Sequence, residues 1–249
     1  MADNKPTLHH LENSQSHLTL WLLEELGIEY TLTKHARVNG RSPSALTAVN
    51  PVGKSPTLVT PSGRVLTERS AIALWLINAY DEGAKFRLPS PNPAAGGNGN
   101  GNVNGGTEDD AVREEQLISF GGATLCPLLT VKLVLALLVK QAPFPIRPLP
   151  ALVRYAVERV FLDAELAKLF GYLDAQLDVR GKEREWFLGT REPTRTDFSL
   201  MWYVDWAVQW KWIDLEKFPR LKAFHARCTA RPAWQRALEK GNGYNVAFW

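Results

Sequence analysis

A stretch with almost nothing to bury divides this chain in two. Residues 89–110 read PSPNPAAGGNGNGNVNGGTEDD, in which large apolar side chains are almost absent. Such a segment cannot offset its conformational entropy by packing, so we expect a flexible linker. The chain is therefore predicted to consist of a first domain over residues 1–88, the linker over residues 89–110, and a second domain over residues 111–249.

The first part of the chain alternates strand and helix patterns. Thr7 to Leu11 has the length and composition of a strand, and helically spaced apolar residues follow as far as Gly27. Glycine at that position suits the left-handed residue that often ends a helix. Residues 28–32 then alternate apolar and polar side chains, as a half-buried strand does. This β–α–β order predicts parallel strands joined by a right-handed crossover.

Beyond a poorly patterned segment, a hairpin and a second helix complete this part. Residues 56–60 and 65–66 flank a turn of Pro, Ser, Gly and Arg, which indicates a β-hairpin. The helix is predicted from Arg69 to Tyr80, with one apolar face made of Ile72, Trp75, Leu76 and Ala79. The first part should therefore be a small mixed sheet covered by helices.

The second part has helical patterning throughout. Helices are expected near residues 114–120, 125–140, 152–177, 197–212 and 220–240. The most apolar stretch, residues 125–139, contains Pro127 and Lys132 and is shorter than the ~20 residues that span a bilayer, so we expect a buried core helix. Three tryptophans at positions 202, 206 and 210 share one helix face, which is typical of a buried or interdomain surface.

Charge and composition exclude several classes of function. The chain has 29 Lys and Arg residues and 26 Asp and Glu residues, so the basic excess is small. The basic residues form no dense run, which argues against a nucleic-acid partner. The two cysteines form no CxxC pair, and His9 and His10 have no third ligand at suitable spacing, so no metal is expected. Cys126 is expected to be a buried, inert thiol. With no apolar leader at the N-terminus, the expected compartment is the cytoplasm.

Several segments, in this order, resemble the cytosolic glutathione S-transferases, and in particular their fungal and bacterial branch. They read LHHLENSQSHLTLWLLEELGIEY (residues 8–30), VNPVGKSPTL (49–58), LTERSAIALWLINAYD (66–81), LCPLLTVKLVLALLVKQAPFPIRP (125–148), FLGTREPTRTDFSL (187–200) and FPRLKAFHARCTARPAWQRA (218–237). The resemblance implies an α/β thioredoxin-like N-terminal domain and an all-α C-terminal domain, usually in a homodimer. It also implies glutathione as co-substrate, whose thiolate attacks an apolar electrophile in a detoxification reaction or reduces a peroxide.

In the family, a hydroxyl from the loop before the first helix activates the glutathione thiol. Ser14 aligns with that position, and Asn13 and Ser16 remain alternatives. The residues themselves agree with this role, because a helix N-terminus favours an anion and a donated hydrogen bond favours the thiolate. Serine at this place is equally a favoured N-cap, so one of the two serines is explained by structure alone.

The resemblance also assigns the contacts that hold glutathione. It implies that Pro56 is cis, that Ser55 pairs with the cysteinyl backbone through its main chain, and that Lys54 meets the glycyl carboxylate. Gly53, Lys54 and Ser55 do not form a phosphate-binding loop, because the wider GxxxxGK[ST] spacing is missing. At the γ-glutamyl end the family has an acidic residue followed by Ser.

Here Glu68 is followed by Arg69, and Ser70 comes one place late. Arg69 is therefore expected either to pair with the γ-glutamyl carboxylate, the arrangement that we favour slightly, or to point to solvent. Thr194 and Asp197 have the spacing of a helix-capping pair and are assigned to structure. Leu125, Leu129 and Trp202 are expected to line the electrophile site.

Two questions stay open at this level. A non-catalytic protein that keeps the fold for binding or regulation would tolerate the departure at Arg69. Peripheral attachment to a membrane is also open for residues 125–148, although a packed helix pair is the simpler account of their apolar pattern.

Overall fold

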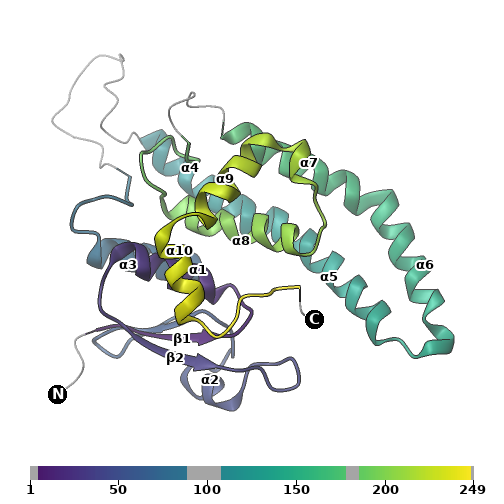
Figure 1. The fold of residues 1–249 in the computed structure, drawn as a ribbon, viewed down its shortest axis with the longest axis horizontal. Coiled ribbons are helices and arrows are strands. Elements are labelled where there is room, and N and C mark those ends of the chain that lie inside the picture. The colour runs from purple at the N-terminus through teal and green to yellow at the C-terminus, as the bar shows by residue number, and fades with distance from the viewer. Residues whose placement is uncertain (1–4, 89–107, 178–184, 248–249) are drawn as a thin grey trace.

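The computed structural model describes residues 5–88, 108–177 and 185–247. Its first domain contains the expected small mixed sheet covered by helices (Figure 1). The sheet has four strands in the order β2-β1-β3-β4. β1 pairs in parallel with β2, whereas the β1–β3 and β3–β4 pairs are antiparallel. The elements in chain order are β1 (Thr7–Leu11), α1 (Ser16–Leu26), β2 (Thr31–His35), α2 (Ser44–Val49), β3 (Thr57–Val59), β4 (Val65–Leu66) and α3 (Arg69–Tyr80).

The core of this domain follows from the apolar spacing of its helices. Trp21 of α1 and Ile72 and Leu76 of α3 are fully buried, together with Leu8 and Leu58 of the sheet. α1 ends at Gly27 in the left-handed region (φ 65°), as predicted. Two details differ from the expectation. The second strand begins only at Thr31, and Ala79 is exposed on α3.

The second domain is helical within the described residues. Its helices are α4 (Glu108–Ser119), α5 (Cys126–Gln141), α6 (Pro148–Val157), α7 (Asp163–Gln176), α8 (Arg195–Gln209), α9 (Pro219–Thr229) and α10 (Pro232–Lys240). π-helical turns at Phe120–Leu125 and Glu158–Leu162 join α4 to α5 and α6 to α7, and short 3-10 turns lie at Phe144–Ile146 and Leu215–Lys217. Residues 108–110 already belong to α4, so the predicted linker ends earlier than expected. The rest of it, residues 89–107, lies outside the described residues.

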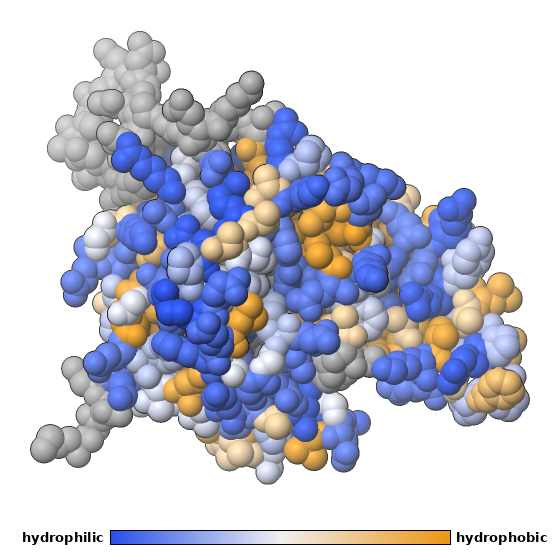
Figure 2. Space-filling model, viewed as in Figure 1, coloured by the Kyte–Doolittle hydropathy of each residue, from blue (hydrophilic) through white to orange (hydrophobic). Residues whose placement is uncertain are grey.

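The apolar stretch over residues 125–139 is not a buried core helix. α5 and α6 form a packed pair that projects from the molecule as an arm, with apolar side chains on its outer surface (Figures 1 and 2). Val134 is 56% exposed, Phe144 87% and Val160 81%. Among the described residues, one helical stretch, Asp109–Gln141, is long and apolar enough to cross a membrane, and only 22% of its most apolar window is buried. The prediction of burial was wrong because apolar spacing does not reveal what covers a helix.

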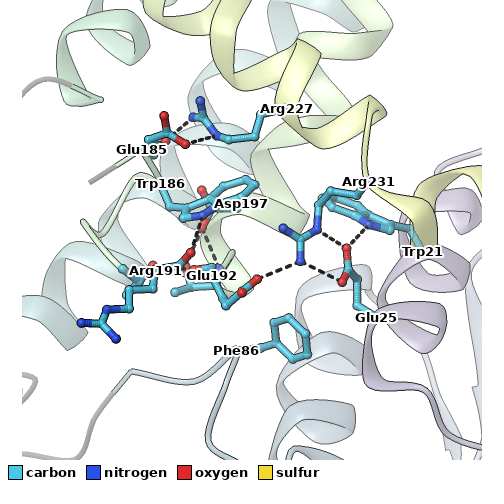
Figure 3. Close-up of polar contacts among 12 residues, drawn as sticks. Trp21, Glu25, Phe86, Glu185, Trp186, Arg191, Glu192, Asp197, Arg227 and Arg231 are labelled. Atoms are coloured by element: carbon cyan, nitrogen blue, oxygen red, sulfur yellow. Dashed lines mark hydrogen bonds and ion pairs between the residues drawn. The ribbon is translucent and has the colours of Figure 1, made fainter. Parts of the chain in front are cut away.

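A charged cluster joins the two domains beside α1 (Figure 3). The Arg231 guanidinium, at the junction of α9 and α10, donates to both carboxylate oxygens of Glu25 on α1 and to Glu192 Oε2 at 2.8 Å. Trp21 Nε1 donates to the same Glu25 carboxylate at 2.9 Å. Since the Glu25 side chain is only 6% exposed, this ion pair is largely shielded from solvent.

The predicted capping pair at the start of α8 is confirmed. The Asp197 carboxylate accepts the Thr194 backbone N–H at 2.7 Å, the Thr194 hydroxyl at 2.9 Å and the Phe187 N–H at 3.1 Å. Complete burial raises the pKa of Asp197 to about 6, against the effect of these donors. The carboxylate thus ties the loop before α8 to the first turn of that helix.

Candidate functional site

A cavity of about 690 Å³ lies between the two domains. The first domain contributes polar groups from the β1–α1 loop and from the segment before β3, including Asn13, Ser14, Lys54 and Ser55. The helical domain contributes Leu133, Trp202 and Trp206. The structure therefore brings four of the predicted site residues together opposite an apolar wall.

Ser14 lines this cavity, just before α1. Its hydroxyl donates to the Leu11 carbonyl oxygen at 2.7 Å and accepts the Ser16 N–H at 3.2 Å. Gln15 occupies the N-cap position of α1, and its side chain makes no capping bond. Ser14, one residue before the N-cap, accepts the Ser16 N–H in its place. To donate to a ligand, the Ser14 hydroxyl must turn away from Leu11.

Asn13 and Ser16 differ in their access to the cavity. Asn13 lines the cavity and has a left-handed backbone (φ 48°), a conformation that asparagine tolerates better than most residues. Ser16 is fully buried, does not line the cavity, and has its hydroxyl 3.1 Å from His10 Nδ1. Of the two alternatives, only Asn13 faces the cavity.

The segment before β3 lines the cavity with Gly53, Lys54 and Ser55. The Ser55–Pro56 peptide bond is cis, as the resemblance implied, and the Ser55 hydroxyl accepts the Leu11 N–H at 3.3 Å. The Lys54 carbonyl oxygen accepts hydrogen bonds from Thr57 Oγ1 at 2.8 Å and from Asn50 Nδ2 at 3.1 Å. These bonds hold the backbone, while the Lys54 side chain remains exposed.

The residues that open α3 do not line this cavity. Glu68 is exposed and has φ 64°, a backbone conformation that is strained for a residue with a side chain. Arg69 is buried, and its guanidinium carbon lies 5.1 Å from the centroid of the Tyr203 ring on α8. Arg69 therefore does not point to solvent, which excludes the second of the two predicted orientations. It packs between the domains, because a facing aromatic ring on α8 accommodates the cation. Ser70 is half-buried in the first turn of α3.

Two arginines that sequence reasoning missed also line the cavity. Arg37 donates from Nη2 to the Asn13 carbonyl oxygen at 3.3 Å, and its backbone N–H donates to Glu12 Oε1 at 2.6 Å. Burial lowers the pKa of Arg37. Arg41 follows the turn at Gly40. Both lie in the poorly patterned segment after β2, where only their positive charge offered a signal.

The apolar wall differs from the expected one. Trp202 lines the cavity, and its ring stacks on that of Trp206 at 5.6 Å between centroids. Leu125 and Leu129 are fully buried in the core, so their assignment to the wall was wrong, and Leu133, further along α5, lies there instead. Cys126 is half-buried rather than buried.

Both histidines of β1 lie within hydrogen-bond distance of another side chain. His9 Nδ1 lies 3.1 Å from His35 Nε2, and the two rings stack at 5.3 Å between centroids. His10 bonds to Ser16, as described above. Within the described residues, no group of three or more His, Cys, Asp or Glu side chains is placed to hold a metal ion.

Sequence comparisons identify relatives over nearly the whole chain. The family model for the N-terminal domain of glutathione S-transferases matches residues 14–79, and that for the C-terminal domain matches residues 153–241. The chain is 29% identical to Glutathione S-transferase 3 of Schizosaccharomyces pombe, covering 94% of this chain and 86% of that protein. It is 20% identical to Glutathione S-transferase 1 of Saccharomyces cerevisiae, covering 97% of each.

Solved structures show the same fold. A glutathione transferase homologue of Lodderomyces elongisporus, solved with two GSH per subunit, has a TM-score of 0.69 at 20% identity and covers 94% of this chain and 98% of its own. Ure2p5 of Phanerochaete chrysosporium, cocrystallised with 1-(S-glutathionyl)-2,4-dinitrobenzene, has a TM-score of 0.67 at 23% identity, covering 96% and 95%. Actinobacillus pleuropneumoniae supplies a further similar glutathione S-transferase structure, with a TM-score of 0.69 at 22% identity, covering 98% and 96%.

Proposed function

Because the chain belongs to the glutathione S-transferase family, we propose that it binds glutathione in the interdomain cavity and activates its thiol for attack on apolar electrophiles. The observation that carries this proposal is the composition of the cavity. Polar and basic groups of the first domain face a wall of Leu133, Trp202 and Trp206. A charged tripeptide and an apolar second substrate need these two surfaces side by side.

Ser14 is the proposed partner of the glutathione sulfur, with Asn13 as the alternative in the same cavity. The N-terminus of α1 favours an anion, and a donated hydrogen bond favours the thiolate over the thiol, whose ordinary pKa is about 8.5. The thiolate then forms a carbon–sulfur bond to the electrophile, which releases its leaving group with the electron pair. Trp202 and Trp206 would hold that electrophile by apolar contact.

The remaining polar residues are proposed to hold glutathione itself. Ser55 offers its main chain to the cysteinyl unit, and Lys54 offers a point charge to the glycyl carboxylate. Arg37 and Arg41 extend this basic side of the cavity. Glu68 does not line the cavity, but the resemblance assigns it to the γ-glutamyl ammonium, and we propose this role because its strained backbone supports a functional position. The neighbouring Arg69 backbone N–H and the Ser70 hydroxyl lie in the same turn.

Retention on immobilised glutathione, followed by conjugation of an activated aryl chloride, tests the proposal. Lys54→Ala should raise the KM for glutathione about tenfold, since a hydrogen bond to a charged group is lost. The matched control Lys168→Ala, which removes an exposed lysine on α7, should behave as the wild type. No retention and no turnover by the wild type would refute the proposed function.

A non-catalytic glutathione-binding protein is the alternative from another class. It predicts retention on glutathione without turnover of any electrophile. Peroxide reduction by the same thiolate is the second catalytic candidate, in which two glutathiones are oxidised to the disulfide and a hydroperoxide is reduced to alcohol and water. An assay with an organic hydroperoxide separates this reaction from conjugation.

The proposed form is a cytoplasmic homodimer with α3 in its interface. Leu74 of α3 is 44% exposed, and the apolar outer surface of the α5–α6 arm also favours an assembled protein. Sedimentation that shows only particles of 27.9 kDa would contradict the homodimer.

Cosedimentation with lipid vesicles tests peripheral membrane attachment through the α5–α6 arm.

A further inference from the structure

The segment Gly241–Ala247, here called the strap, crosses the β1–α1 loop after leaving α10 (Figure 1). It brings the far end of the described chain against the residues proposed to activate the thiol. None of the sequence patterns pointed to this segment, because it has neither helical nor strand periodicity.

Two reciprocal hydrogen bonds tie the strap to Asn13. The Asn13 backbone N–H donates to the Gly243 carbonyl oxygen at 3.1 Å. The Asn245 backbone N–H donates to Asn13 Oδ1 at 2.7 Å. Together these bonds hold both the left-handed backbone of Asn13 and the orientation of its amide, whose oxygen is engaged.

The strap is itself anchored on both sides of the cavity. On the sheet side, Asn242 Nδ2 donates to the His35 carbonyl oxygen at 3.0 Å. On the helical side, Trp210 Nε1 donates to the Val246 carbonyl oxygen at 2.7 Å, and the Val246 N–H donates to Gln209 Oε1 at 2.9 Å. The strap therefore connects β2, the β1–α1 loop and the end of α8.

Packing reinforces these bonds. The Tyr244 ring stacks on His17 of α1 at 4.0 Å between centroids. Val246 is 2% exposed and lines the cavity next to the tryptophan wall. Gly243 has φ 113°, which residues with a side chain rarely adopt, and a Cβ there would meet Asn13 Oδ1 at 3.3 Å.

We propose that the strap is part of the active site, where it positions the Asn13–Ser14 loop against the glutathione sulfur and closes the electrophile side with Val246. This inference rests on the proposed glutathione chemistry. The strap residues act through the loop, so they are positioning residues, with Val246 as the one that faces the second substrate.

The sharpest test is a pair of substitutions at Asn245. Asn245→Pro removes the backbone donor to Asn13, whereas Asn245→Ala keeps it. Loss of this orienting bond should lower kcat about fivefold and raise the pKa of the bound glutathione thiol, measured by thiolate absorbance. Asn245→Ala, which keeps the bond to Asn13 and removes only the side-chain acceptor for the Ala247 N–H, should change both quantities less than Asn245→Pro does. A melting curve recorded for each variant shows whether the fold is intact.

Glycine substitutions supply an independent test. Gly243→Ala should displace the strap from Asn13 and give the same changes, whereas Gly83→Ala has no atom within 4 Å of the added Cβ and should change nothing. Val246→Ala should raise the KM for the electrophile but not that for glutathione. Wild-type thiol pKa and kcat in both Asn245→Pro and Gly243→Ala would overturn the inference. Absence of thiolate formation in the wild type would instead refute the proposed function.

Discussion

The guanidinium of Arg69 lies over the ring of Tyr203, 5.1 Å from its centroid, and thereby joins the first turn of α3 to α8. Both residues are 8% exposed. Arg69 therefore belongs to the contact between the domains, although it stands where the family has a serine for glutathione.

Replacing Arg69 should reduce stability rather than glutathione affinity. We expect Arg69→Ala to lower the free energy of unfolding by about 2 kcal/mol, since a desolvated cation–π contact and its packing are lost. Tyr203→Phe keeps the ring and should cost less. Denaturant unfolding and glutathione titration measure the two effects. Weaker glutathione binding at unchanged stability would place the Arg69 side chain in the site.

An alanine series across the β1–α1 loop identifies the residue that activates the thiol. Ser14→Ala should raise the pKa of bound glutathione thiol by roughly one to two units, because a hydrogen bond to a charged group is worth about 1.5–3 kcal/mol. Ser16→Ala should leave that pKa unchanged, since its hydroxyl faces His10. Wild-type values in Ser14→Ala together with a raised pKa in Asn13→Ala would transfer the role to Asn13.

Breaking the pair between Arg231 and Glu25 should strongly destabilise the protein. Arg231→Ala leaves a carboxylate that is 6% exposed without its cation, at an expected cost of about 3 kcal/mol. The control is Lys222→Ala, whose pair with Glu216 is exposed and should be worth less than about 1 kcal/mol. Equal effects of the two substitutions, measured by chemical unfolding, would contradict the structural importance of this cluster.

Buried histidines should make the fold sensitive to acid. Burial lowers the pKa of His10 to about 4 and that of His17 to about 3, from an ordinary value of 6.5. The contribution of these two neutral histidines to the free energy of unfolding is complete above pH 6.5. It is lost as the pH falls toward 4 for His10 and toward 3 for His17, because in this range only the unfolded chain takes up the protons. Within that pH range, each histidine should lower the free energy of unfolding by about 1.4 kcal/mol for every unit by which the pH falls.

His17→Phe keeps a ring between Tyr244 and Trp234 but removes one of these titrations. The melting temperature of this variant should therefore fall less steeply than that of the wild type between pH 6.5 and 4. A slope identical to the wild type would show that His17 does not contribute to acid unfolding.

Local patterns predicted the elements whose formation depends on neighbouring residues. β1 and α3 have the predicted bounds, Thr7–Leu11 and Arg69–Tyr80, and Thr194 and Asp197 form the predicted capping pair. Each of these is determined within a few residues by apolar spacing or by a side chain that bonds its own turn.

Features that depend on distant contacts could not be read in this way. The Arg69 guanidinium packs against the Tyr203 ring of α8, and bonds to Gln209 and Trp210 hold Val246 at the cavity. The outer surface of α5 was missed for a related reason. Hydrophobic spacing is the same in a helix that is covered and in one that is not, so a sequence cannot distinguish Leu129 from Val134.

The place of Trp21 has a consequence for the order in which the protein is made. Its ring is fully buried, against Phe198 at 4.6 Å and Trp234 at 5.3 Å between centroids. The ribosome synthesises the whole first domain long before it reaches Phe198 and Trp234. Until then, the Trp21 indole and the neighbouring face of α1 lack the side chains that bury them in the folded protein. The domain boundary predicted from the sequence is therefore not a boundary at which the nascent chain can complete its folding.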